Sequence, residues 1–131
     1  MGYRSTIIFG VEQSHAPKLD EILKEHGMRT DEKVHKLYPN YKMVKDEFGD
    51  FKSWEKTDDL QMVIYKSEYQ KWYEDYDDVR AVTRFLDFLA VEEGAEETTF
   101  LVGLGEDGEI HSEIGDWYNY VDHISKLEIQ E

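Results

Sequence analysis

Residues 77–92 read DDVRAVTRFLDFLAVE, and this stretch carries the clearest structural signal in the chain. Its apolar residues recur at steps of three, four and three positions, namely Val79, Val82, Leu86 and Leu89. That spacing places them on one helical face, because an α-helix turns once in about 3.6 residues. Two aspartates open the stretch, where they suit the positive end of the helix dipole. We therefore predict a helix over 77–92 whose apolar face packs on a sheet.

The rest of the chain adds one more helix and several strands. An apolar run predicts a central strand over 3–11, and Leu19, Ile22 and Leu23 predict a helix over 15–26 that ends before Gly27. Further strands are predicted over 60–66, 98–104, 109–114 and 120–129. This order indicates a single α+β domain over 1–131. We expect one mainly antiparallel sheet with the two main helices packed on one face, and a ferredoxin-like layout fits that order.

Residues 28–56 give conflicting signals. Thr30 suits the start of a short helix that ends before Pro39, and Val44, Phe48 and Phe51 suit a second helix, which Gly49 would weaken. Residues 51–56 alternate imperfectly and predict a strand, which we expect to form a hairpin with 60–66.

The net charge of −15 is distributed unevenly along the 131 residues. Residues 1–66 hold 12 acids and 11 Lys or Arg residues, whereas residues 67–131 hold 18 acids and four Lys or Arg residues. Such a field repels nucleic acids and anionic membranes and attracts basic protein surfaces. The chain has no cysteine, no apolar run long enough for a membrane span and no signal-peptide pattern, so we expect a cytoplasmic protein.

Two clusters combine aromatic rings with carboxylates. The first consists of Tyr65, Glu68, Tyr69, Trp72, Tyr73, Glu74, Asp75, Tyr76, Asp77 and Asp78, and the second of Glu113, Asp116, Trp117, Tyr118, Tyr120 and Asp122. The candidate partner-binding residues are all of these except Tyr65, Asp78, Tyr120 and Asp122. Tyr and Trp are common anchors in protein interfaces, and carboxylates around them would steer a basic partner. The alternative is a strand end with buried aromatic rings followed by a helix cap, and for Trp72 we favour this alternative. The spacing leaves open whether the two clusters form one surface.

Catalytic and cofactor motifs are weak. Residues 103–108 match the G-x-G-x-x-G pattern, but strand-like residues follow where a dinucleotide site requires a helix. The acids of 106–109 and His111 are possible metal ligands, although a calcium loop needs a longer pattern and a tight turn is the preferred interpretation. We predict no metal and no cofactor.

Three short motifs resemble those of small uncharacterised bacteriophage and prophage proteins. They are the opening Met1–Ser5 (MGYRS), Lys71–Val79 (KWYEDYDDV) and Gly105–Asp107 (GED). The resemblance implies a phage or prophage setting and an α+β fold, and it implies no activity.

The leading hypothesis is a non-catalytic acidic protein-binding module, namely a phage-encoded modulator or inhibitor of a host protein. Its expected partner is a basic protein surface, for example a nucleic-acid-binding protein that a DNA mimic would occupy. The alternatives are an immunity-type protein that neutralises a basic toxin, a small metal-dependent hydrolase that uses His111, and a small-ligand sponge with residues 28–56 around its pocket. The oligomeric state is left open.

Overall fold

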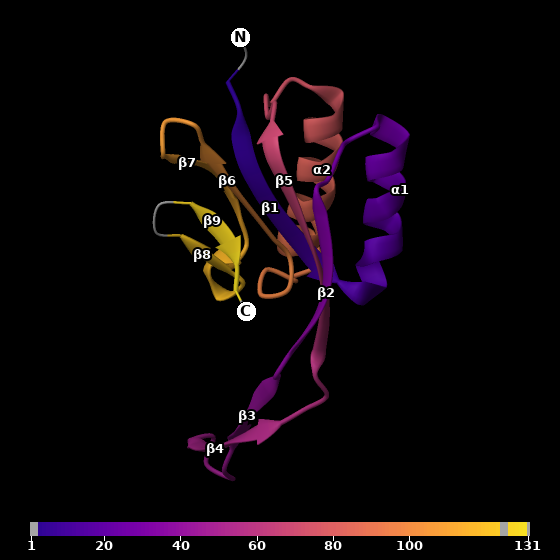
Figure 1. The fold of residues 1–131 in the computed structure, drawn as a ribbon. Coiled ribbons are helices and arrows are strands. Elements are labelled where there is room, and N and C mark those ends of the chain that lie inside the picture. The colour runs from indigo at the N-terminus through magenta and orange to yellow at the C-terminus, as the bar shows by residue number, and fades with distance from the viewer. Residues whose placement is uncertain (1–2, 124–125, 131) are drawn as a thin grey trace.

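The computed structural model describes residues 3–123 and 126–130 and contains one five-stranded sheet with helices on one face (Figure 1). The strands of this sheet are β1 (Ser5–Glu12), β2 (Glu32–Tyr38), β5 (Leu60–Gln70), β6 (Phe100–Gly105) and β7 (Ile110–Ile114). They lie in the order β2-β5-β1-β6-β7, and every neighbouring pair is antiparallel. The predicted α+β class, with a large antiparallel sheet and two helices, is confirmed.

Strand β1 lies at the centre of the sheet because its residues are apolar on both faces. Ile7 and Phe9 point into one core cluster and Ile8 into another, and all three are fully buried. Such a nearly continuous apolar run is typical of a strand that is covered on both sides. The side chains on the two sides alternate along the strand, as the pleat requires.

Helices α1 (Ala16–His26) and α2 (Asp77–Asp87) cover one face of the sheet and contact each other. Gly27 ends α1 in the left-handed conformation that the sequence predicts, with φ of 65°. The apolar stripe of α2 is buried as expected, and the helix continues as one π-helical segment, Phe88–Glu92. The core on this side contains Leu19, Val82 and Leu86.

A small hairpin covers part of the opposite face. It consists of β8 (Val121–His123) and β9 (Leu127–Ile129), where the sequence predicts one strand over 120–129. Tyr120, Val121 and Leu127 are buried against the sheet, and the ring of Tyr120 stacks on Phe100 at 4.7 Å. The prediction of one strand is therefore wrong, and the hairpin buries apolar residues of both its strands against the sheet.

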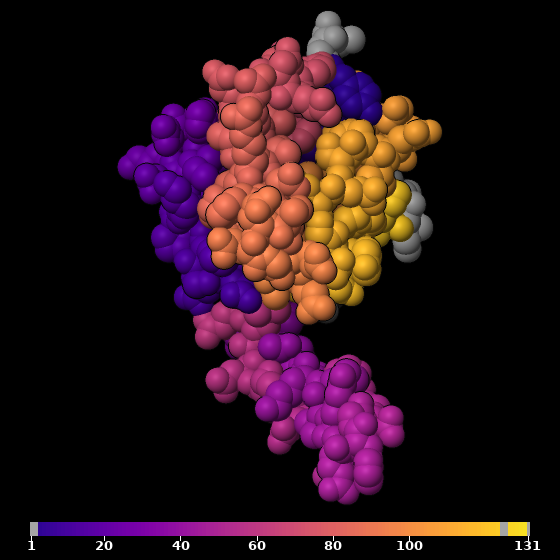
Figure 2. Space-filling view, turned by 180° about the vertical axis from the view of Figure 1, so that it is seen from behind, coloured from indigo at the N-terminus to yellow at the C-terminus, as the bar shows by residue number. Residues whose placement is uncertain are grey.

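Residues 28–56 differ most from the prediction. The expected helix after Thr30 is strand β2, which pairs with β5, and the expected helix around Phe48 is a turn. Residues 51–56 do form a strand, β4 (Phe51–Lys56), but it pairs with β3 (Tyr41–Lys45) rather than with 60–66. Strands β3 and β4 form a separate two-stranded hairpin that projects from the body, and we call residues 41–56 the arm (Figures 1 and 2).

None of the helices in the described ranges is both long enough and apolar enough to cross a membrane.

Candidate functional site

The first predicted cluster lies where β5 ends and α2 begins, and its members divide into buried and exposed residues. Trp72 is only 8% exposed and belongs to the core with Val79, so the interpretation favoured for it is confirmed. Tyr73 is half-buried, and its hydroxyl accepts a 2.7 Å hydrogen bond from the backbone N–H of Tyr3. Tyr69 and Tyr76 are exposed, so these two rings remain as contact candidates.

Tyr69 has an unusual backbone conformation. Its φ of 54° makes it the one non-glycine residue with positive φ in the described part of the chain. The register between β1 and β5 shifts at this point, so that Glu68 and Tyr69 bulge opposite Thr6. The left-handed conformation disfavours a residue with a Cβ, and bulges often redirect a side chain. Here the bulge leaves the Tyr69 side chain in solvent, with 78% of its surface exposed.

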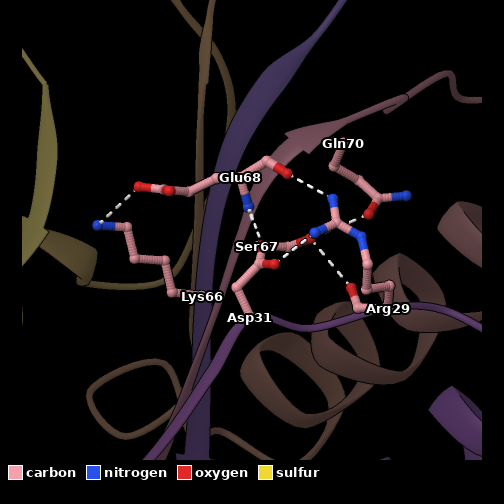
Figure 3. Close-up of polar contacts among 6 residues, drawn as sticks. All are labelled: Arg29, Asp31, Lys66, Ser67, Glu68 and Gln70. Atoms are coloured by element: carbon pink, nitrogen blue, oxygen red, sulfur yellow. Dashed lines mark hydrogen bonds and ion pairs between the residues drawn. The ribbon is translucent and has the colours of Figure 1, made fainter.

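A network of hydrogen bonds joins the strand next to this bulge to the loop after α1 (Figure 3). The backbone N–H of Glu68 donates to the Asp31 carboxylate at 2.6 Å, and Arg29 donates to the Glu68 carbonyl at 2.5 Å. Arg29 also pairs with Asp31, and the Ser67 hydroxyl donates to the Arg29 carbonyl at 3.0 Å. The loop after α1 therefore supplies the hydrogen bonds that fix the conformation of the bulged strand.

The β6–β7 turn lies at the same end of the sheet, because Ser5 is paired with both Gln70 and Gly105. The Tyr3 hydroxyl donates to Asp107 at 2.6 Å; this hydrogen bond raises the pKa of Tyr3 and lowers that of Asp107. The β5–α2 loop reaches the same end, because Tyr73 is hydrogen-bonded to Tyr3. We call the carboxylates of the end of β5, of the following residues up to the first turn of α2 and of the β6–β7 turn the acidic end: Glu68, Glu74, Asp75, Asp77, Asp78, Glu106, Asp107 and Glu109.

The second predicted cluster lies at the other end of the sheet. Glu113 precedes Ile114, which pairs with Leu101 near the start of β6, and the N–H of Asp116 donates to the Glu96 carbonyl at 3.0 Å. Trp117 donates its indole N–H to Glu113 at 2.9 Å and packs against the core that the small hairpin covers. Tyr118 is exposed, and the nearby Asp116 carboxylate raises its pKa. The two clusters therefore do not merge into one continuous surface.

Members of both clusters nevertheless border a shared depression between α2 and β7, namely Trp72 and Glu74 of the first and Glu113 of the second. This depression has a volume of about 380 Å³ and is lined by Glu74, Arg80, Arg84, His111 and Glu113, among others. Arg80 and Arg84 are two of the four Lys or Arg residues in 67–131, which hold 18 acids.

His111 is held by two hydroxyl groups. Its Nε2 lies 2.8 Å from Ser5 Oγ and its Nδ1 lies 2.8 Å from Ser112 Oγ. Burial lowers the pKa of His111, against the opposing effect of Asp107. The described residues contain no group of three or more His, Asp or Glu side chains that could hold a metal ion.

The arm is the largest exposed apolar feature that the sequence analysis missed. Its exposed large apolar side chains are Tyr41, Met43, Phe48, Phe51 and Trp54. In the ladder, Met43 lies opposite Trp54 and Lys45 opposite Phe51, which places these side chains on one face. The rings of Phe51 and Trp54 are 5.8 Å apart. The available signal was the alternation of apolar and charged residues in Tyr41-Lys42-Met43, which is typical of a strand with two different faces.

The tip and base of the arm are both ordered by hydrogen bonds. The Asp46 carboxylate accepts from the N–H groups of Phe48 and Asp50 at 2.8 and 2.9 Å, and Gly49 supplies a positive φ of 85°. At the base, the N–H of Thr57 donates to the Asn40 carbonyl at 2.9 Å. The apolar face is thus presented by a closed hairpin rather than by a loop.

No protein-family model, no curated protein and no solved structure matches this chain.

Proposed function

We propose that this protein is a non-catalytic protein-binding module. The observation that supports the proposal is the arm, which projects from the body (Figure 1) and exposes five large apolar side chains, among which the rings of Phe51 and Trp54 lie next to each other. Exposed patches of this kind are typical of interaction sites, because the free energy falls when a partner removes apolar surface from water. The arm is therefore the apolar contact surface of the proposed function.

The body favours a basic partner. The arm contains four lysines and four acidic residues, so the whole net charge of −15 lies outside it. Exposed carboxylates at the acidic end would accelerate encounter with a basic surface, and exposed Tyr69 and Tyr76 would add contact area there. We propose a basic host-protein surface, of the kind that holds nucleic acid, as the partner of the body. The phage setting of this proposal rests on the resemblance of the three short motifs.

We also propose that the core of the sheet is ferredoxin-like. The elements β1, α1, β2, β5, α2 and β6 follow the β-α-β-β-α-β order, and their strands are arranged β2-β5-β1-β6. In this description the arm is an insertion between β2 and β5, and β7 with the β8–β9 hairpin is an addition at the end of the chain.

The proposed function is tested by capture of a partner from a bacterial lysate with three forms of the immobilised protein. The first is the unmodified chain, the second replaces Met43 and Trp54 by Gln, and the third replaces Glu74, Asp75 and Asp77 by Lys. We expect the charge reversal to slow association of a captured basic protein, most strongly at low salt. We expect the arm variant to retain less of the partner.

Two results would contradict the proposal. One is a captured partner whose contact surface is acidic. The other is a partner that both variants bind as well as the unmodified protein does, because its contacts would then lie outside both surfaces.

A further inference from the structure

The two faces of the arm differ in chemistry. Tyr41, Met43, Phe51 and Trp54 occupy one face, together with Lys45 and Lys56. The other face carries Val44 opposite Ser53, and Lys42 opposite Glu55 with their charged groups 3.7 Å apart. An apolar face backed by a polar one is the pattern of a sheet that packs against something on one side.

Nothing in the described part of the chain covers the apolar face of the arm. All six residues of β4 are exposed, and β3 and β4 pack mainly on each other. An isolated two-stranded hairpin is marginally stable in water. A layer that covers its exposed apolar face would stabilise it by removing that surface from water. The arm therefore has an energetic reason to bind another surface.

The charge of the arm indicates which surface that is. The electrostatic attraction of a basic partner is toward the body, where the net charge of −15 lies, because the four lysines of the arm balance its four acids. The apolar face presents lysines beside aromatic rings, and it is complementary to a copy of itself because each lysine can lie over a ring of the other arm. We propose that the apolar face of the arm packs against the same face of a second copy of this chain.

The dimensions of the arm are compatible with such a dimer. The four exposed apolar side chains of this face present about 500 Å² of surface on each arm, so two arms would bury about 1,000 Å². That area is near the lower limit for a specific interface and predicts a weak, reversible dimer with two-fold symmetry. The inference rests on the proposed role of the arm as a protein-binding surface.

The projection of the arm also keeps two acidic bodies apart. A five-residue strand spans about 17 Å. Repulsion between exposed charges is screened beyond about 10 Å at 0.1 M salt but extends to about 30 Å at 0.01 M. The dimer should therefore strengthen as salt is raised. Binding of a basic partner to the acidic body should weaken under the same change, so the two interactions have opposite salt dependence.

Sedimentation of the full chain tests the proposal, with protein from micromolar to millimolar concentration and salt at about 0.01 M and 0.5 M. We expect a monomer–dimer equilibrium that shifts toward dimer at the higher salt. Trp54→Gln should weaken the dimer by about tenfold or more, as truncation of an interface anchor does. The matched control Val44→Gln, on the other face of the same hairpin, should change the dissociation constant by about twofold at most.

Three outcomes would overturn the inference. They are a monomer at every concentration and salt, a dimer that Trp54→Gln leaves intact, and a dimer that Val44→Gln disrupts as strongly as Trp54→Gln. A monomer whose partner capture still depends on Met43 and Trp54 would refute self-association and leave the proposed function standing. A dimer that captures no other protein would support self-association and contradict the proposed binding of a basic host protein. Thermal melts of both variants should match the unmodified protein, which shows that the body remains folded.

Discussion

Met43 lies directly opposite Trp54 in the β3–β4 ladder, and both side chains are largely exposed, by 47% and 63%. Cross-strand pairs of this kind stabilise a hairpin, but their outer surface remains in water. The body of the protein is built differently, since most of its apolar residues are buried between the sheet and the covering elements. The predictions below use this contrast between exposed and buried residues.

The first prediction concerns the core of α2. Leu86 is fully buried between α2 and the sheet, so Leu86→Ala should lower the free energy of unfolding by about 2–5 kcal/mol. Val91→Ala is the matched control, because Val91 is 67% exposed and its truncation should change stability by about 0.5 kcal/mol at most. Urea denaturation of both variants measures the difference, and equal midpoints would contradict the assignment of the α2 face.

The second prediction compares two buried tyrosines. The Tyr65 hydroxyl donates to Asp20 at 2.6 Å, whereas the Tyr38 hydroxyl has no hydrogen-bond partner among the described residues. Tyr65→Phe should cost about 1.5–3 kcal/mol, since it removes a hydrogen bond to a charged group. Tyr38→Phe should be neutral or stabilising, because it removes a buried hydroxyl that makes no bond. A denaturant melt that ranks the two variants in the opposite order would refute this account of the two hydroxyl groups.

The third prediction concerns acid stability. Burial alone would raise the pKa of Asp20, but hydrogen bonds from Tyr65 and Lys33 outweigh burial, and the net effect lowers that pKa below its ordinary value of 3.8. A carboxylate with a lowered pKa in the folded state contributes stability above its unfolded pKa, and that contribution is lost as the pH falls through the folded pKa. Asp20→Asn should therefore reduce the loss of stability below about pH 4. Melts from neutral pH to pH 2.5 should show a shallower slope for the variant, and an identical slope would contradict the prediction.

The fourth prediction tests the strain at Tyr69. Because φ is 54° there, Tyr69→Gly should be more stable than Tyr69→Ala by about 1 kcal/mol. Both variants remove the exposed ring, so their difference isolates the backbone. Calorimetric melting measures the difference, and an alanine variant at least as stable as the glycine variant would show that the left-handed conformation costs nothing.

The fifth prediction concerns metal ions. We expect calcium and magnesium to associate weakly with the acidic end through charge alone, with an affinity that decreases as salt is raised. Asp107→Asn and His111→Ala should each leave this weak association almost unchanged. Titration calorimetry that finds a tight site of fixed stoichiometry, abolished by either substitution, would favour the hydrolase alternative.

The helices and the β6–β7 turn were predictable because their signals are local. The apolar stripe of 77–92, the stop at Gly27 and the Asp107–Gly108 turn each depend on residues within a few positions of one another. Burial of Trp72 was also predicted, because alternating aromatic residues at a strand end point into the core. Residues 28–56 were misassigned because the three-residue step from Val34 to Leu37 suits a helix, whereas in β2 the two side chains lie on opposite faces and Leu37 is exposed.

The sequence by itself determined the charge, the two main helices and the α+β class. Only the tertiary structure decided that β2 pairs with β5 while β4 pairs with β3, and this pairing forces residues 41–56 out of the sheet as an arm. Likewise, only the folded sheet separates the two aromatic clusters, because it places Gln70 at one end and Ile114 at the other. The physical reason is that a strand is stabilised by hydrogen bonds to a partner far along the chain, whereas a helix forms its hydrogen bonds within itself.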